Sequence, residues 1–180
     1  MTYGWTGYNL EVDLSQGKTE KTEIAPSFNE TYIGGRGANA RLFWDRVPPE
    51  VEPFSPENLL IFRAGALVGT SAPATSRVTI TTKSPQINLQ TFATLGGFWG
   101  VELKHAGYDS VVISGKSPTP VYLWINDDQA EIRDASHLWG KDTRETQEAI
   151  REELNNDGIQ IVAIGLAGEN KVKFASMEHD

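Results

Sequence analysis

The chain has 180 residues, of which 39% are hydrophobic and 22% charged, a composition typical of one globular domain rather than of a disordered segment. Its net charge of −8 argues against nucleic-acid binding, and the absence of cysteine excludes disulfides, thiol catalysis and thiolate ligation within this stretch. No apolar run is long enough to span a membrane and the N-terminus lacks a signal-peptide pattern, so we expect a cytoplasmic protein without membrane contact.

The first half of the chain is predicted to contain mostly short strands. Residues 8–14 alternate and end at a Ser-Gln-Gly turn, which predicts a hairpin with residues 18–24. Glycines precede a helical pattern over residues 38–47, which two prolines end. Further strands are predicted at 59–62, 78–82 and 88–94, with a loop of small residues at 64–74.

The second half begins with a helical pattern over residues 98–106. Strands are predicted at 110–114 and 121–125, and the second forms a hairpin with residues 130–133. Asp142 and Glu145 have the spacing of a capping box, which predicts a helix over residues 142–155. Two closing strands are expected at 159–164 and 171–177.

The order of these elements is not a strict alternation of strands and helices, which favours an α+β fold. A glycine pair precedes a helix and then a strand twice, once at Gly34-Gly35 and once at Gly96-Gly97. Coincidence is one explanation. The other is a pseudo-twofold duplication, in which two β-rich halves with short helices pack together.

Two glycine-containing segments are candidate binding elements. A glycine pair that enters a helix lets a ligand approach the backbone, and its free N–H groups attract anions. The pattern does not match the dinucleotide-binding fingerprint, so the alternative is that these glycines only form turns. Residues 65–77 form a long loop of small residues that ends at Arg77, whose donors suit a carbonyl, carboxylate or phosphate, unless the arginine is merely solvated.

Other residues give no catalytic constellation. The three histidines, His105, His137 and His179, lack the spacing of metal ligands and are expected to be structural or on the surface. No nucleophile and base stand together, and the acidic residues of the predicted helix over 142–155 look like a solvated face. We therefore expect no catalytic residue in this stretch.

An ordered set of motifs resembles the N-terminal domain of the tungsten-containing aldehyde:ferredoxin oxidoreductase family. The resemblance runs from about residue 3 to the last residue and rests on these segments: Gly34-Gly-Arg-Gly, Ser55-Pro-Glu-Asn, Gly69-Thr-Ser-Ala-Pro, Arg77, Thr82-Lys-Ser-Pro, Gly96-Gly-Phe-Trp-Gly, Glu102-Leu-Lys, Ala106-Gly-Tyr-Asp, Ile132-Arg-Asp-Ala-Ser-His, Trp139-Gly and Gly165-Leu-Ala-Gly-Glu-Asn. No single motif is diagnostic, but their order and spacing are specific.

The resemblance implies a base for a tungsten bis-pterin cofactor beside a [4Fe–4S] cluster. Arg77 matches the family arginine that links pterin and cluster, and Thr94, Leu95, Gly96 and Gly97 match a loop that contacts a pterin and its phosphates. The position of Thr94 offers a backbone carbonyl to a magnesium ion in the family, where it usually carries an amide side chain. Threonine here is a departure that a backbone role tolerates.

The resemblance leaves two substrates open. Residues 44–62 look closest to the tungsten subunit of ATP-independent benzoyl-CoA reductases, whereas Ser76-Arg77 and residues 81–85 look more like members that oxidise aldehydes with ferredoxin as electron acceptor. The family's cluster cysteines and acid–base residues lie in later domains. We therefore expect residues 1–180 to be an N-terminal domain, truncated and inactive alone, whose partners are downstream domains and ferredoxin or an electron-transfer subunit, with a second copy as a further candidate. A non-catalytic pterin-binding or assembly module is the alternative of another class.

Overall fold

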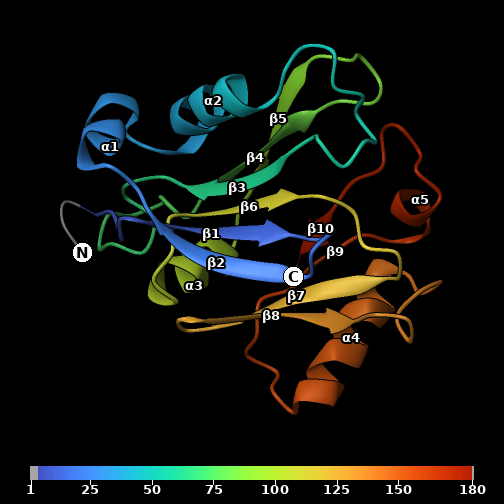
Figure 1. Ribbon diagram of the computed structural model, residues 1–180. Coiled ribbons are helices and arrows are strands. Elements are labelled where there is room, and N and C mark those ends of the chain that lie inside the picture. Colours follow the sequence, from blue (N-terminus) through green and yellow to red (C-terminus); the bar gives the residue numbers. More distant parts are fainter. Residues whose placement is uncertain (1–3, 180) are drawn as a thin grey trace.

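A six-stranded mixed sheet forms the centre of the computed structural model, which describes residues 4–179 (Figure 1). Its strands lie in the order β2-β1-β6-β3-β4-β5. Only β1 and β6 run parallel, and the other neighbours are antiparallel. The strands are β1 (Tyr8–Asp13), β2 (Lys18–Glu23), β3 (Leu60–Ala64), β4 (Val78–Lys83), β5 (Gln90–Leu95) and β6 (Ser110–Ser114).

Helices cover both faces of this sheet. Helices α1 (Pro26–Tyr32) and α2 (Gly35–Arg46) lie on one face, and α3 (Trp99–His105) lies on the other (Figure 1). Because successive strand residues point to opposite faces, Ile61 packs with Phe43 of α2, whereas Phe62 packs with Trp99 of α3, their ring centroids 5.3 Å apart. The alternation therefore gives each helix its own apolar core.

A buried polar network fixes α2 on its face of the sheet. The Arg63 side chain is 1% exposed and donates to the side-chain oxygens of Asn39 of α2 (3.2 Å) and Asn9 of β1 (2.9 Å). The Asn39 amide in turn donates to Thr79 O (3.1 Å) and Thr81 Oγ1 (3.2 Å). Burial lowers the pKa of Arg63 to about 10, because the charged form loses its hydration. These directional bonds specify how α2 lies across three strands.

The C-terminal part forms a smaller layer against the α3 face (Figure 1). It contains the hairpin β7–β8, the helix α4 and two short strands that pair with each other. The α4 capping box forms as predicted, since Glu145 N donates to Asp142 and Asp142 N donates to Glu145. The elements are β7 (Val121–Asn126), β8 (Gln129–Asp134), α4 (Thr143–Leu154), β9 (Val162–Ala163), α5 (Leu166–Glu169) and β10 (Glu178–His179).

The two parts repeat one order of elements. Each has a hairpin, helical structure, a strand, a long loop and an antiparallel strand. In the first part Ala64 of β3 pairs with Val78 of β4, and in the second part Ala163 of β9 pairs with Glu178 of β10. Each long loop therefore joins two strand ends that are paired with each other. Residues 65–77 and 164–177 therefore occupy equivalent places. This repeat differs from the predicted glycine-pair repeat, whose two strands, β3 and β6, are antiparallel neighbours within one sheet.

The predicted α+β class is confirmed, but several local predictions need correction. The predicted strand over 171–177 is wrong: this segment is irregular, and Phe174 in it is exposed. The predicted strand over 159–164 reduces to two residues, and α5 follows it. Helix α1 went unpredicted because it has no apolar periodicity, although Pro26 occupies its first turn. Among residues 4–179 no helix is both long and apolar enough to cross a bilayer.

Candidate functional site

Three glycine-containing segments meet at one end of the large sheet, where β3 ends and β4 begins. A Cβ on Gly34 would lie 3.2 Å from the carbonyl oxygen of Ala64, so the first segment packs on the start of the 65–77 loop. The end of β5 joins them because Thr94 pairs with Thr79 of β4. We call residues 33–37, 65–77 and 94–97 the glycine-rich rim.

The rim brings Arg77 and Thr94 together, seventeen residues apart in sequence. Arg77 Nη1 donates to Thr94 Oγ1 over 3.2 Å, and both side chains are exposed. A guanidinium carries five N–H donors in a planar fork, which suits recognition of phosphate or other anionic oxygens. The rim therefore presents a fixed cation beside a hydroxyl group at an open edge.

Gly96 and Gly97 leave the backbone at this edge bare. A Cβ on Gly96 would meet no atom within 4 Å, and Gly97 has a φ of +66°, a conformation that side chains disfavour. Leu95 points the other way and is buried in the core, so its side chain is not available to a ligand. Only the backbone of residue 95 fits the predicted role in cofactor contact.

The loop over residues 65–77 is held by its own hydroxyl groups. Thr70 Oγ1 donates to Leu67 O (2.7 Å), and Thr75 Oγ1 donates to Leu67 O (3.0 Å) and to Ala72 O (2.9 Å). Helix α3 packs behind the loop, since a Cβ on Gly100 would lie 3.4 Å from Val68 Cγ1. The loop is thus a shaped element and not a loose connection.

Arg36 adds a second exposed cation that the sequence reasoning did not single out. Its guanidinium lies 3.7 Å from the centroid of the Phe92 ring, on the strand that leads to Thr94. The ring face attracts the cation and holds it near the glycine pair Gly34-Gly35. The signal that could have found it is an arginine inside a glycine-rich helix entrance.

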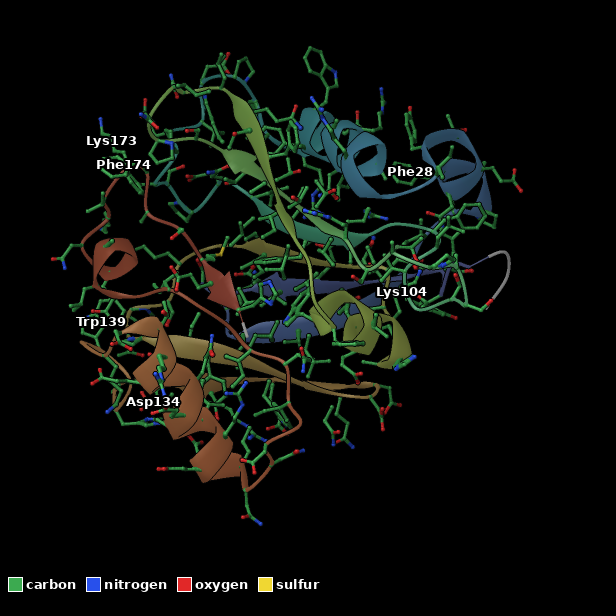
Figure 2. All side chains as sticks on the ribbon, turned by 180° about the vertical axis from the view of Figure 1, so that it is seen from behind. Phe28, Lys104, Asp134, Trp139, Lys173 and Phe174 are labelled. Atoms are coloured by element: carbon green, nitrogen blue, oxygen red, sulfur yellow. The ribbon has the colours of Figure 1, made fainter. Side chains whose placement is uncertain are left out.

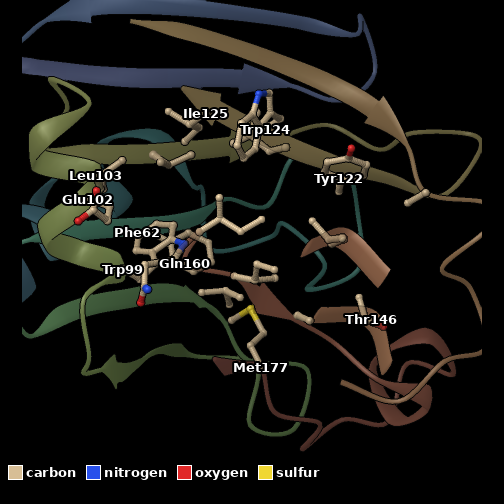
Figure 3. A pocket seen from close by; sticks show the side chains of 18 of the residues that line it. Phe62, Trp99, Glu102, Leu103, Tyr122, Trp124, Ile125, Thr146, Gln160 and Met177 are labelled. Atoms are coloured by element: carbon tan, nitrogen blue, oxygen red, sulfur yellow. The ribbon is translucent and has the colours of Figure 1, made fainter. Parts of the chain in front are cut away.

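A large apolar cavity lies elsewhere, between the α3 face of the large sheet and the C-terminal layer (Figure 3). It has a volume of about 710 Å³, is partly open to solvent, and is lined by Phe62, Trp99, Leu103, Tyr122, Trp124 and Met177, among others. None of the predicted site residues lines it. Its few polar groups, such as Glu102, Thr146 and Gln160, form no nucleophile–base pair, so its chemistry is that of a packing surface.

Titratable residues form no metal cluster within residues 4–179, where no group of three His, Asp or Glu side chains converges on one point. His137 bonds Glu153 (3.0 Å) and His105 lies 3.8 Å from Glu102, both on the surface as expected. His179 belongs to β10, far along the chain from either.

Comparisons with known proteins agree on one family. The model of the aldehyde ferredoxin oxidoreductase N-terminal domain matches residues 9–180. The tungsten-containing aldehyde ferredoxin oxidoreductase of Thermococcus kodakarensis is 46% identical over 178 residues, 99% of this chain and 29% of the relative. The WOR-like subunit of the aliphatic sulfonate oxidoreductase of Pyrococcus furiosus is 35% identical, over 97% of this chain and 30% of the relative.

A solved structure is similar over nearly the whole chain. A chain of the active site complex BamBC of benzoyl coenzyme A reductase, in complex with 1,5-dienoyl-CoA, superimposes with a TM-score of 0.97. It is 57% identical, and the match covers 99% of this chain and 27% of that chain. The chain thus spans less than a third of the length of these relatives.

Proposed function

We propose that this chain, which belongs to the aldehyde ferredoxin oxidoreductase family, is the cofactor-binding base of a longer tungsten-pterin oxidoreductase. The observation that carries the proposal is the glycine-rich rim, where Arg77 and Thr94 stand beside the bare backbone of Gly96 and Gly97. Its open edge and exposed cations fit a flat anionic ligand such as a pterin phosphate.

Each rim residue has a distinct role in this proposal. Arg77 would donate hydrogen bonds to the pterin and place a positive charge near the [4Fe–4S] cluster, whose cysteine ligands would come from other domains. Gly96 and Gly97 would let the pterin approach the backbone, and the carbonyl of Thr94 would be a ligand for magnesium. The bound tungsten supplies the redox chemistry, and the chain supplies orientation and charge.

The partners we propose begin with the remainder of the same polypeptide. The chain covers 29% of the Thermococcus kodakarensis relative, and the exposed apolar lining of the cavity fits a surface that downstream segments cover. Ferredoxin or an electron-transfer subunit then receives electrons, and a second copy is a further candidate partner. We place the enzyme in the cytoplasm.

The reaction we propose is oxidation of aldehydes to carboxylic acids with ferredoxin as electron acceptor. Four curated tungsten-containing aldehyde ferredoxin oxidoreductases support it, at 43–46% identity. The second candidate is the tungsten subunit of an ATP-independent benzoyl-CoA reductase, which the 57% identity to the BamBC chain favours. Because downstream residues contact the substrate, the two reactions share the rim described above.

Cofactor content of the full-length enzyme tests the binding role of the rim. We expect Arg77→Gln to lower tungsten per protomer, measured by mass spectrometry, and pterin, measured by fluorescence after oxidation. Arg144→Gln is the matched control, since Arg144 is 86% exposed on α4 and bonds only the neighbouring turn at Glu148. Equal cofactor content in both variants would contradict a role of Arg77 in binding.

Substrate assays separate the two reactions. The purified full-length enzyme is given short and aromatic aldehydes with oxidised ferredoxin, and separately an aromatic acyl-CoA with a strong reductant. Aldehyde oxidation without acyl-CoA reduction supports the first candidate, and the reverse pattern supports the second. Normal cofactor content with neither reaction would move the proposal toward a different substrate of the same family.

A further inference from the structure

A buried ion pair lies directly behind the glycine-rich rim. The side chains of Lys104 on α3 (Figure 2) and Asp109 are 0% and 2% exposed, and Lys104 Nζ donates to Asp109 Oδ1. Both charges also hold the segment 4–7, which we call the N-terminal strap. Lys104 Nζ donates to Gly4 O (2.7 Å), while the Asp109 carboxylate accepts from Thr6 N (3.0 Å) and Gly7 N (2.9 Å).

The N-terminal strap touches two segments of the rim. Gly4 has a φ of +84°, and a Cβ there would lie 2.1 Å from the carbonyl oxygen of Ala66, so the strap backbone lies against the 65–77 loop. Trp5 Nε1 donates to the carbonyl of Ile33 over 2.7 Å. Since Ile33 directly precedes Gly34-Gly35, the strap connects the ion pair to the first glycine segment.

Lys104 also contacts the 65–77 loop directly. Its Cβ would lie 3.3 Å from a Cβ built on Gly69, where the backbone has a φ of +75°. The aliphatic stem thus packs under the loop while the ammonium group holds the strap above it. No larger residue fits at position 69 without moving the lysine or the loop.

We propose that Lys104 and Asp109 are positioning residues for the cofactor site, which act through the N-terminal strap to fix the glycine-rich rim. This inference rests on the proposed function, because it treats the rim as the cofactor-binding edge. Buried ion pairs add little stability over apolar side chains, but their directional bonds fix the groups that they hold. Gly4 and Gly7 both have positive φ, which glycine adopts without strain, and three of the bonds that hold the strap end on the two charges, beside those of Trp5 to Ile33 and of Ile24 to Gly7.

A second buried lysine, which lies in the large sheet, provides a control. Lys83 is 5% exposed at the far end of β4, and its ammonium group donates to Pro49 O (2.6 Å) and Val51 O (2.7 Å). Like Lys104 it is a buried cation that donates to backbone carbonyl oxygen, although Lys104 is also paired with the Asp109 carboxylate. It contacts none of the rim residues through these bonds, so its loss should loosen a different part of the molecule.

Amide hydrogen exchange of the 180-residue chain tests the inference. In Lys104→Met, we expect exchange at the bonded amides of Thr6, Gly7, Val68 and Thr70 to rise at least about tenfold over the original chain. In Lys83→Met these amides should keep their rates, while Val51 exchanges faster. Trp5→Phe leaves the buried pair intact and should speed only the amides near Ile33, which keeps the test usable if Lys104→Met does not fold.

Two results would overturn the inference. One is faster exchange at Thr6 and Gly7 with unchanged rates at Val68 and Thr70, because the strap would then not position the rim. The other is an equal rise in Lys104→Met and Lys83→Met, because the effect would then be general destabilisation. If Lys104→Met fails to fold, unchanged amides near Ile33 in Trp5→Phe would likewise overturn it.

The cofactor content of the full-length enzyme separates this inference from the proposed function. If positioning matters for binding, Lys104→Met loses tungsten and pterin while Lys83→Met retains them. An original enzyme without pterin would refute the proposed function, yet the exchange rates would still report whether the ion pair holds the rim. Loss of exchange protection without loss of cofactor would refute the positioning role itself.

Discussion

Replacing Gly100 by alanine measures how tightly α3 packs against the loop of the glycine-rich rim. A Cβ at this position would lie 2.3 Å from Val78 Cγ2, 3.4 Å from Val68 Cγ1 and 3.6 Å from the carbonyl of Ser76. Real Cβ atoms do not approach a methyl group that closely, so either the helix or β4 must move. The movement would displace the loop that ends at Arg77.

The expected magnitude combines two opposing effects. Overpacking a core typically costs about 1–3 kcal/mol, while alanine in place of glycine in a helix gains about 0.5–1 kcal/mol. The net loss of unfolding free energy for Gly100→Ala is therefore between about 0 and about 2.5 kcal/mol. Val78→Ala alone leaves a cavity and costs about 2–3 kcal/mol, from two buried methyl groups at about 0.8 kcal/mol each plus the void.

The double variant gives the decisive comparison, because Val78→Ala removes the methyl group that the new Cβ meets. Steric relief predicts a favourable coupling of at least about 1 kcal/mol, so the double variant should be no less stable than Val78→Ala alone. Urea unfolding at constant m-value measures all four proteins. Gly96→Ala is the control, with a change within about 0.5 kcal/mol, since its Cβ meets nothing within 4 Å. Additive losses in the double variant would refute the packing argument.

Three further predictions concern other parts of the fold. Asp142→Ala removes the side-chain oxygen that accepts from Glu145 N in the α4 capping box and should lower the unfolding free energy by about 1 kcal/mol in urea, whereas an unchanged midpoint would show that this bond contributes nothing. Burial raises the pKa of Tyr108 above its ordinary 10.0, so the unfolded state loses the phenol proton at a lower pH than the folded state, and the free energy of unfolding falls as pH rises above about 10. Tyr108→Phe should flatten this fall, and an equal dependence of unfolding free energy on pH in both proteins would contradict it. Phe62→Ala removes a buried ring that packs at a tilt against Trp99 and should cost about 3–5 kcal/mol and weaken the near-ultraviolet dichroism, which a midpoint like that of the original chain would contradict.

Local patterns predicted the elements whose signals lie within one stretch of chain. The capping box of Asp142 and Glu145 placed α4, and alternation placed the β1–β2 hairpin. Arg77 and Thr94, each named as a candidate cofactor contact, lie side by side because β4 and β5 pair in register. Their roles toward a cofactor stay a prediction.

Contacts between distant segments could not be predicted from these patterns. Asn39, Arg63 and Asn9 form one buried network, yet each looks like an ordinary surface residue in its own segment. The two residues of the Lys104–Asp109 pair are only five positions apart, but the pair bonds the N-terminal strap, which lies a hundred positions earlier in the chain. Whether the Leu95 side chain points into the core likewise depends on which face of β5 meets the core. Strand pairing determines that face, and the local sequence does not.

The apolar cavity affects how the volume of the molecule changes when it unfolds, and this change can be measured under pressure. Hydrostatic pressure favours the state with the smaller volume, and unfolding eliminates the dry part of any internal void. The pocket of about 710 Å³ between the two layers is partly open to solvent, so only the part of it that stays dry adds to the volume decrease on unfolding. A longer polypeptide whose downstream residues fill that space would lose less volume on unfolding, so its pressure midpoint should lie above that of the 180-residue chain.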